Sequence, residues 1–188
     1  MSASPIDELR ALFLVRGDRR YGEATLQINH AIHCATLAER EGSPAWLVTA
    51  ALTHDIGHLL RPEADPAELG NDDDRHEDVG ARWLEGRFDP RVAQVVGAHV
   101  NARRYLCTTE PGYMRSLPVQ CLRALALQGG PMCSADAARF DADALSNEAL
   151  RLLRWDDRSL RSEVDGSRLE HFLSIARLAM RPALRTQA

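Results

Sequence analysis

An adjacent histidine and aspartate, His54-Asp55, form the strongest chemical signal in this sequence of 188 residues. Three more histidines flank the pair at similar intervals: His30 lies 24 residues before His54, His76 lies 22 after it, and His99 lies a further 23 along. Imidazole and carboxylate ligands suit borderline divalent metals such as iron, manganese or zinc. A carboxylate beside a ligand histidine can also bridge two ions, as in two-metal sites. The spacing therefore predicts a site for two metals.

A second carboxylate follows late in the chain, where Asp156 and Asp157 are adjacent and the residue types alone leave both open as ligands. The histidines are expected to point inward, since His99 ends an apolar stripe and His76 opens a segment with apolar residues at helical spacing. A buried imidazole without a partner is costly. Joint metal binding therefore explains the four histidines better than packing does.

Composition narrows the function classes. A net charge of −4 and a pI near 6 argue against binding of a nucleic-acid backbone. All 23 basic residues are arginine, which excludes Schiff-base and P-loop lysine chemistry. The four cysteines form no CxxC pair, and no apolar run reaches the length of a membrane span. These features predict a cytoplasmic protein with free thiols that binds neither nucleic acid nor membrane.

The arrangement of helix signals predicts an all-α fold, with residues 1–188 forming a single domain. Ser4-Pro5 and Asp89-Pro90 are typical of helix starts. One helix is expected to carry both His54 and His58 on one face, a turn apart. The expected helices span about 5–16, 24–40, 44–58, 75–83, 118–128, 148–160 and 167–184, and a further helix starts at Pro90 and carries His99 and, one turn later, Arg103.

The ordered motifs carry a family resemblance from about residue 21 to residue 157. The chain resembles the HD-domain superfamily, and within it the mixed-valent diiron oxygenases represented by 2-amino-1-hydroxyethylphosphonate dioxygenase and, more distantly, myo-inositol oxygenase. A bare His-Asp pair is a weak signal, whereas the full set is strong. The motifs that carry the resemblance are Tyr21-Gly22-Glu23, His30-Ala31-Ile32-His33-Cys34-Ala35, His54-Asp55-Ile56-Gly57-His58, His76-Glu77-Asp78-Val79-Gly80-Ala81, 99–106, 128–132 and Trp155-Asp156-Asp157.

The resemblance implies an HD-domain helical bundle with a buried dinuclear metal site and two iron ions (Fe2+/Fe3+). One iron would be held by His30, His54, Asp55 and the late aspartate, which is Asp156 by similarity with Asp157 as the alternative. The second would be held by Asp55, His76 and His99. Asp55 would thus bridge the two ions.

The resemblance also implies roles around the metals. Tyr21 and Glu23 would form a catalytic lid, although Tyr21 could equally be an ordinary loop aromatic. His58 would contact the substrate and take part in catalysis. Arg103 would reach over the second iron to meet the substrate's oxyanion, with a solvated helix end as the alternative. Gln128 would also contact the substrate.

The implied function is that of a diiron oxygenase with O2 as co-substrate. It would oxidise C1 of a small hydroxylated organophosphonate and cleave its C–P bond, releasing phosphate. The substrate partner is then a small anion of the 1-hydroxyphosphonate type. The resemblance would place hydroxyl side chains that bind the phosphonate at positions 118 and 121 and a basic residue at position 153, but the chain has Pro118, Cys121 and Leu153 there. These departures weaken the inference about the substrate more than the inference about the reaction class. The alternatives are a metal-dependent HD phosphohydrolase acting on a nucleotide or other phosphate ester, and a regulatory HD domain.

Overall fold

The computed structural model describes residues 3–21, 25–61, 75–159 and 168–185. Within these residues the fold is all-α, as predicted, and extended structure is limited to a short antiparallel ribbon, β1 (Arg20–Tyr21) with β2 (Thr25–Leu26), and one isolated bridge. The helices are α1 (Pro5–Arg16), α2 (Gln27–Arg40), α3 (Ala45–Thr53), α4 (Ile56–Leu60), α5 (His76–Leu84), α6 (Pro90–Thr109), α7 (Tyr113–Ser116), α8 (Val119–Leu127), α9 (Ser134–Asp141), α10 (Ser146–Ser159), α11 (Leu169–Leu178) and α12 (Pro182–Arg185).

The predicted starts of two helices are confirmed. The Ser4 side chain accepts a hydrogen bond from the backbone N–H of Asp7, and Pro5 occupies the first turn of α1. The Asp89 side chain accepts from the backbone N–H of Arg91 at the start of α6. Each cap satisfies a backbone donor that the first helical turn leaves unpaired.

The single helix expected over 44–58 is wrong. The structure ends α3 at Thr53 and starts α4 at Ile56, so that His54 and Asp55 occupy the break. The break lets α4 run close to the start of α5: a Cβ on Gly57 would lie 2.0 Å from the backbone oxygen of His76. Only glycine permits this approach.

Other boundaries also differ. The helix expected over 167–184 is divided into α11 and α12, because Pro182 lacks a backbone donor and starts a new helix. The bend is stabilised where the Arg181 N–H donates to the Arg87 carbonyl. Residues 25 and 26 form β2 rather than the first turn of α2. The short helices α7 and α9 were not predicted.

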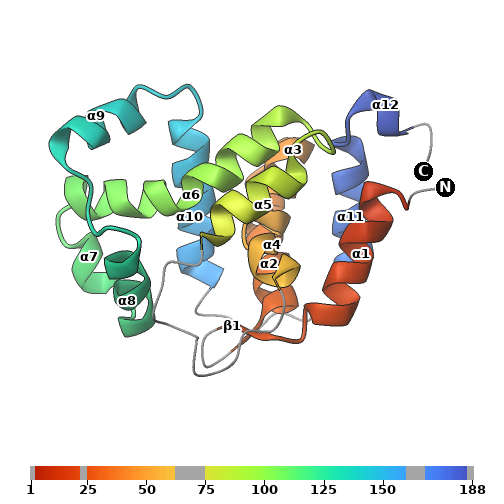
Figure 1. Cartoon of the computed structure of the whole chain (residues 1–188), viewed down its shortest axis with the longest axis horizontal. Coiled ribbons are helices and arrows are strands. Elements are labelled where there is room, and N and C mark those ends of the chain that lie inside the picture. Colours follow the sequence, from red (N-terminus) through yellow and green to blue (C-terminus); the bar gives the residue numbers. More distant parts are fainter. Residues whose placement is uncertain (1–2, 22–24, 62–74, 160–167, 186–188) are drawn as a thin grey trace.

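Helix α6 lies at the centre of the fold and packs against α3, α5, α9 and α10. Figure 1 shows α1 and α11 on one side of this centre and α7, α8 and α9 on the other. The main core surrounds Trp155, Phe172 and Leu9, all at most 1 % exposed. Five elements (α2, the α3–α4 break, α5, α6 and α10) therefore meet in the middle of the molecule.

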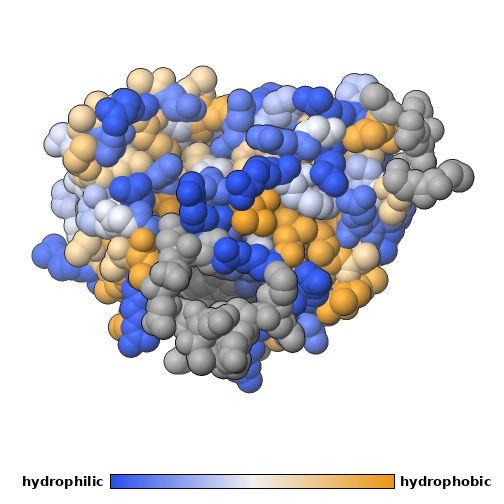
Figure 2. All heavy atoms as spheres, in the orientation of Figure 1, coloured by the Kyte–Doolittle hydropathy of each residue, from blue (hydrophilic) through white to orange (hydrophobic). Residues whose placement is uncertain are grey.

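The surface of the described residues carries both hydrophilic and hydrophobic side chains. Leu14 and Val15 are 68 % and 72 % exposed, and Figure 2 shows hydrophobic surface at the lower right, over the C-terminal end of α1. None of the described helices combines the length and the apolarity that a membrane span requires.

Candidate metal centre

The structure brings together all six residues that the resemblance implies as metal ligands. Five of them form two groups, one on each side of Asp55, and all six residues are buried. The first group, His30, His54 and Asp156, comes from α2, the α3–α4 break and α10, and the buried thiol of Cys34 on α2 lies beside it. The second group, His76 and His99, comes from α5 and α6.

The two carboxylate oxygens of Asp55 face different groups. Oδ2 lies 3.3 Å from His54 Nε2 and 3.6 Å from His30 Nε2. Oδ1 lies 3.3 Å from His76 Nε2 and 3.7 Å from His99 Nε2. One carboxylate thus offers an oxygen to each side, which is the geometry that a bridging ligand needs.

The late carboxylate in the first group is Asp156. Its Oδ1 lies 3.2 Å from His30 Nε2 and 3.9 Å from His54 Nε2. The neighbouring Asp157 accepts a hydrogen bond from the Tyr113 hydroxyl instead, at 2.7 Å. The geometry therefore favours Asp156 over Asp157 as a ligand.

Backbone carbonyls fix two of the rings. His54 Nδ1 donates to the Ala51 carbonyl at 3.0 Å, and His99 Nδ1 donates to the Val96 carbonyl at 2.7 Å. In the neutral ring, a proton on Nδ1 leaves a lone pair on Nε2. Both Nε2 atoms are therefore oriented as ligands, in the manner that second partners commonly impose on metal-binding histidines.

A serine that the sequence reading missed orients the third ring. Ser159 Oγ lies 2.7 Å from the Asp156 carbonyl oxygen and 2.7 Å from His30 Nδ1. The carbonyl can only accept, so it takes the single hydroxyl proton and the ring nitrogen must donate to Oγ. Ser159 stands three residues after Asp156, and this helical spacing was the available signal.

Ser159→Ala is expected to weaken metal binding by the first group about tenfold, because outer partners of metal-bound histidines typically contribute 10- to 100-fold in affinity. Anaerobic calorimetric titration of the chain with Mn2+ measures the change. Ser174→Ala is the matched control, since the Ser174 hydroxyl bonds to a backbone carbonyl on the surface. Equal affinity in Ser159→Ala and the parent chain would show that Ser159 does not orient His30.

The donor set fits metal ions. His30 Nε2 and His54 Nε2 lie 3.1 Å apart, and His76 Nε2 and His99 Nε2 are also 3.1 Å apart. If both rings are neutral, the hydrogen bonds described above turn the lone pairs of His30 and His54 toward each other, an arrangement that a cation between them relieves. Asp55 Oδ2 is buried and has no hydrogen-bond partner among the described residues. A buried carboxylate oxygen without a donor is costly unless a cation lies beside it.

The pKa values of the buried groups also indicate that the site suits a metal cation. Burial would raise the pKa of Asp55, but His54 and His76 hold it well below its usual value. Burial would lower the pKa of His54, but Asp55 and Asp156 raise it to about 9, so the carboxylates attract positive charge to this position. Burial and His76 lower the pKa of His99 to about 3, which leaves its ring neutral, as a ligand must be.

Arg103 lies in a position different from the expected one. Its guanidinium donates from Nη2 to Asp156 Oδ2 at 2.6 Å, so it contacts the first group rather than reaching over the second. The side chain is buried, which also excludes a solvated helix end. Burial opposes charge on Asp156, yet Arg103 and His30 lower its pKa.

The other predicted site residues are placed as follows. His58 is half-buried, and its ring stacks on His76 with centroids 4.1 Å apart, so it lies beside the second group and not on the face of His54. Tyr21 ends β1, and Glu23 lies outside the described residues, so their roles stay predictions. Gln128 ends α8, and its Oε1 is buried without a hydrogen-bond partner in the described part of the chain.

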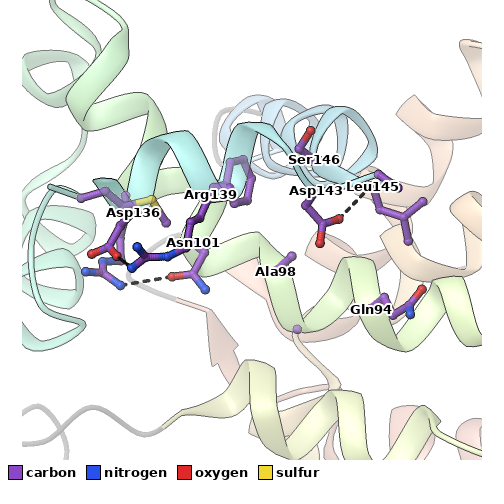
Figure 3. A pocket seen from close by; sticks show the side chains of 13 residues that line it. Gln94, Ala98, Asn101, Asp136, Arg139, Asp143, Leu145 and Ser146 are labelled. Carbon is purple, nitrogen blue, oxygen red and sulfur yellow. Dashed lines mark hydrogen bonds and ion pairs between the residues drawn. The ribbon is translucent and has the colours of Figure 1, made fainter. Parts of the chain in front are cut away.

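A groove of about 710 Å³ lies along another face of α6 (Figure 3). It is lined by residues of α6, α9 and the start of α10, including Gln94, Asn101 and Asp136, and by none of the six candidate ligands. Arg139, which points into the groove, pairs with Asp136. The candidate metal centre is therefore separate from this groove.

A histidine, an adjacent histidine–aspartate pair and a distant aspartate, brought together by separate helices, define the centre. Residues 27–148, which include the pair and the two later histidines, match the sequence model of the HD domain. The chain belongs to the HD domain family. The first candidate ligand, His30, is the fourth residue of the matched range. The last one, Asp156, lies on α10 after the matched range has ended.

Relatives of this HD-domain protein match it over most of its length. [1-Hydroxy-2-(trimethylamino)ethyl]phosphonate dioxygenase (glycine-betaine-forming) of Leisingera caerulea is 33 % identical over 169 residues, which are 89 % of this chain and 86 % of the relative. Hydroxymethylphosphonate dioxygenase of Gimesia maris is 36 % identical over 161 residues, 84 % of this chain and 80 % of the relative. An uncharacterized protein of Acanthamoeba polyphaga mimivirus is 34 % identical over 145 residues, which are 76 % of this chain and 66 % of the relative.

Proposed function

We propose that this HD-domain protein is a diiron oxygenase that uses O2 to oxidise C1 of a small hydroxylated organophosphonate and cleaves the C–P bond, releasing phosphate. The observation that carries the proposal is the placement of Asp55, whose two oxygens face two separate groups of ligands. Two relatives that match most of the chain are phosphonate dioxygenases, which supports the reaction class.

In this proposal His30, His54 and Asp156 hold the first iron, His76 and His99 hold the second, and Asp55 bridges them. Imidazole and carboxylate ligands suit iron in both oxidation states. A bound Fe2+/Fe3+ pair supplies the redox chemistry with O2. The protein contributes buried ligands with fixed orientation, and Arg103 balances the charge of Asp156.

The overall reaction balances with O2 as the oxidant. A 1-hydroxyphosphonate loses its C1 hydrogen and its C–P bond, and the products are a carboxylate and inorganic phosphate, which together contain both oxygen atoms of O2. His58 lies beside the second group and can hydrogen-bond the substrate hydroxyl. Tyr21, Glu23 and Gln128 stay proposed contacts of the substrate pocket.

The second candidate is a metal-dependent phosphohydrolase. Two metal ions can also activate water against phosphate esters, and the same ligand set would serve them. Two positions where hydroxyl donors for a phosphonate were expected are instead Pro118, which precedes α8, and Cys121, which is buried. Leu153 is also buried, in the core between α6 and α10, where a basic residue was expected.

Oxygen uptake by the iron-loaded protein, measured with a series of 1-hydroxyphosphonates, tests the proposal. The series extends from hydroxymethylphosphonate to substrates with larger groups on C1, including a trimethylammonium group. Uptake that requires both the hydroxyl and the phosphonate supports it. Rapid hydrolysis of nucleotides or phosphodiesters, with no oxygen uptake on any member of the series, would favour the phosphohydrolase.

A further inference from the structure

Arg103 lies between two carboxylates. Its Nη2 is 2.6 Å from Asp156 Oδ2 and 3.6 Å from Asp157 Oδ1. Asp157 is in turn held from α7, where the Tyr113 hydroxyl donates to Oδ2 at 2.7 Å. Tyr113, Asp157, Arg103 and Asp156 therefore form a continuous row of polar contacts that ends at His30.

Asp156 divides its two oxygens between different partners. Oδ1 faces His30 Nε2 at 3.2 Å, whereas Oδ2 accepts from Arg103. An arginine can instead bind both oxygens of a carboxylate with its planar fork. Such a bidentate pair would occupy Oδ1 and compete with a metal ion for it. The position of the guanidinium therefore determines how well Asp156 serves as a ligand.

Asp157 keeps the guanidinium from that alternative position. Its Oδ1 faces Arg103 and is buried without a hydrogen bond from any residue in the described part of the chain. The direction of Oδ1 is set by the Tyr113 bond to the other oxygen. Tyr113 is itself buried, follows Gly112 at φ +87°, and has the Arg154 guanidinium over its ring at 5.3 Å, so its hydroxyl has a fixed position.

We propose that Tyr113 and Asp157 are positioning residues that set the metal affinity of the first group by holding Arg103 against a single oxygen of Asp156. The inference rests on the metal centre of the proposed function but not on its reaction with O2. Neither residue contacts the ligand nitrogen atoms. Their effect passes through Arg103 alone.

Tyr113→Phe tests the proposal, because it removes only the hydroxyl. Binding of Mn2+ is measured by anaerobic calorimetry in the His99→Ala background, which disables the second group. We expect affinity to fall about three- to tenfold, less than the roughly 10- to 100-fold typical of partners that touch a metal ligand directly, because Tyr113 acts through Asp157 and Arg103. Tyr105→Phe is the matched control, since the Tyr105 hydroxyl donates to Asp141 at 3.0 Å on the surface; it should leave affinity unchanged.

A double-mutant cycle separates positioning from general stability. In an Arg103→Met background, Tyr113→Phe should produce no further loss of Mn2+ affinity, because the residue it acts through is gone. Asp157→Asn keeps an acceptor for Tyr113 but lacks the charge, so it should weaken Mn2+ binding as Tyr113→Phe does. It replaces Tyr113→Phe as the test if that variant folds poorly.

Unchanged Mn2+ affinity in folded Tyr113→Phe, or an undiminished effect in the Arg103→Met background, would overturn the inference. A parent chain that binds no Mn2+ would overturn both the inference and the metal centre. Normal Mn2+ binding with the expected loss in Tyr113→Phe, but without oxygen uptake on any phosphonate, would contradict the proposed function alone.

Discussion

Asp55→Ala is expected to lose both metal ions together, from about two ions per chain to nearly none after anaerobic iron loading. Asp55 is the only one of the six candidate ligands that offers an oxygen to both groups. Its removal leaves the first group with one carboxylate and the second with two neutral imidazoles. Oxidation of the substrate should fall to background with the metal.

Elemental analysis of the loaded and desalted protein measures this loss. His99→Ala is the informative comparison, because it should mainly lose the ion of the second group. Asp136→Ala is the control, since Asp136 pairs with Arg139 on the surface. Asp55→Asn keeps the side-chain volume, so it shows whether the metal loss in Asp55→Ala comes from the missing carboxylate or from a folding defect. Retention of one tightly bound ion in both Asp55 variants would show that the two groups bind metal independently.

Arg103→Met should lower the thermal stability of the metal-free protein strongly. The guanidinium and Asp156 are both buried, and removing one partner of a buried ion pair costs roughly 3–5 kcal/mol because the other charge is left without compensation. For a chain of this size, that corresponds to a fall in Tm of roughly 6–20 °C. Metal loading should reduce the difference in Tm between the Arg103→Met variant and the parent chain, since an ion beside Asp156 supplies the missing positive charge.

Differential scanning calorimetry with and without Mn2+ measures both effects. Arg139→Met is the control, because surface ion pairs contribute little. Arg103→Lys should recover part of the stability, since lysine keeps the charge but not the planar fork. A change in Tm that is small, or that is equal with and without metal, would mean that Arg103 does not balance the charge of this ligand.

The sequence predicted which residues gather at the candidate metal centre, because such residues are few, chemically distinctive and spaced by whole helices. His30, His54, His76 and His99 each come from a separate element, as their intervals required. The all-α fold followed from the composition and from helix caps such as Ser4. Periodicity alone could not show the break at His54-Asp55, because the residues on both sides continue a helical apolar pattern.

Hydrogen bonds that support the centre from distant segments were not predicted from the sequence. Ser159 and His30 are separated by 129 positions and Tyr113 and Asp157 by 44, and nothing in either local pattern links them. The position of Arg103 was wrong for a related reason: its place on α6 could be predicted, but the direction of a long side chain depends on Asp156, which comes from α10.

The dependence of phosphate release on oxygen tests the central claim most directly. Iron-loaded protein and a 1-hydroxyphosphonate are incubated in parallel under air and under strict anaerobiosis, and phosphate and oxygen are measured together. A diiron oxygenase predicts about one O2 consumed per phosphate released under air, and no phosphate release without oxygen. Equal phosphate release in both vessels would contradict the account and identify the centre as hydrolytic.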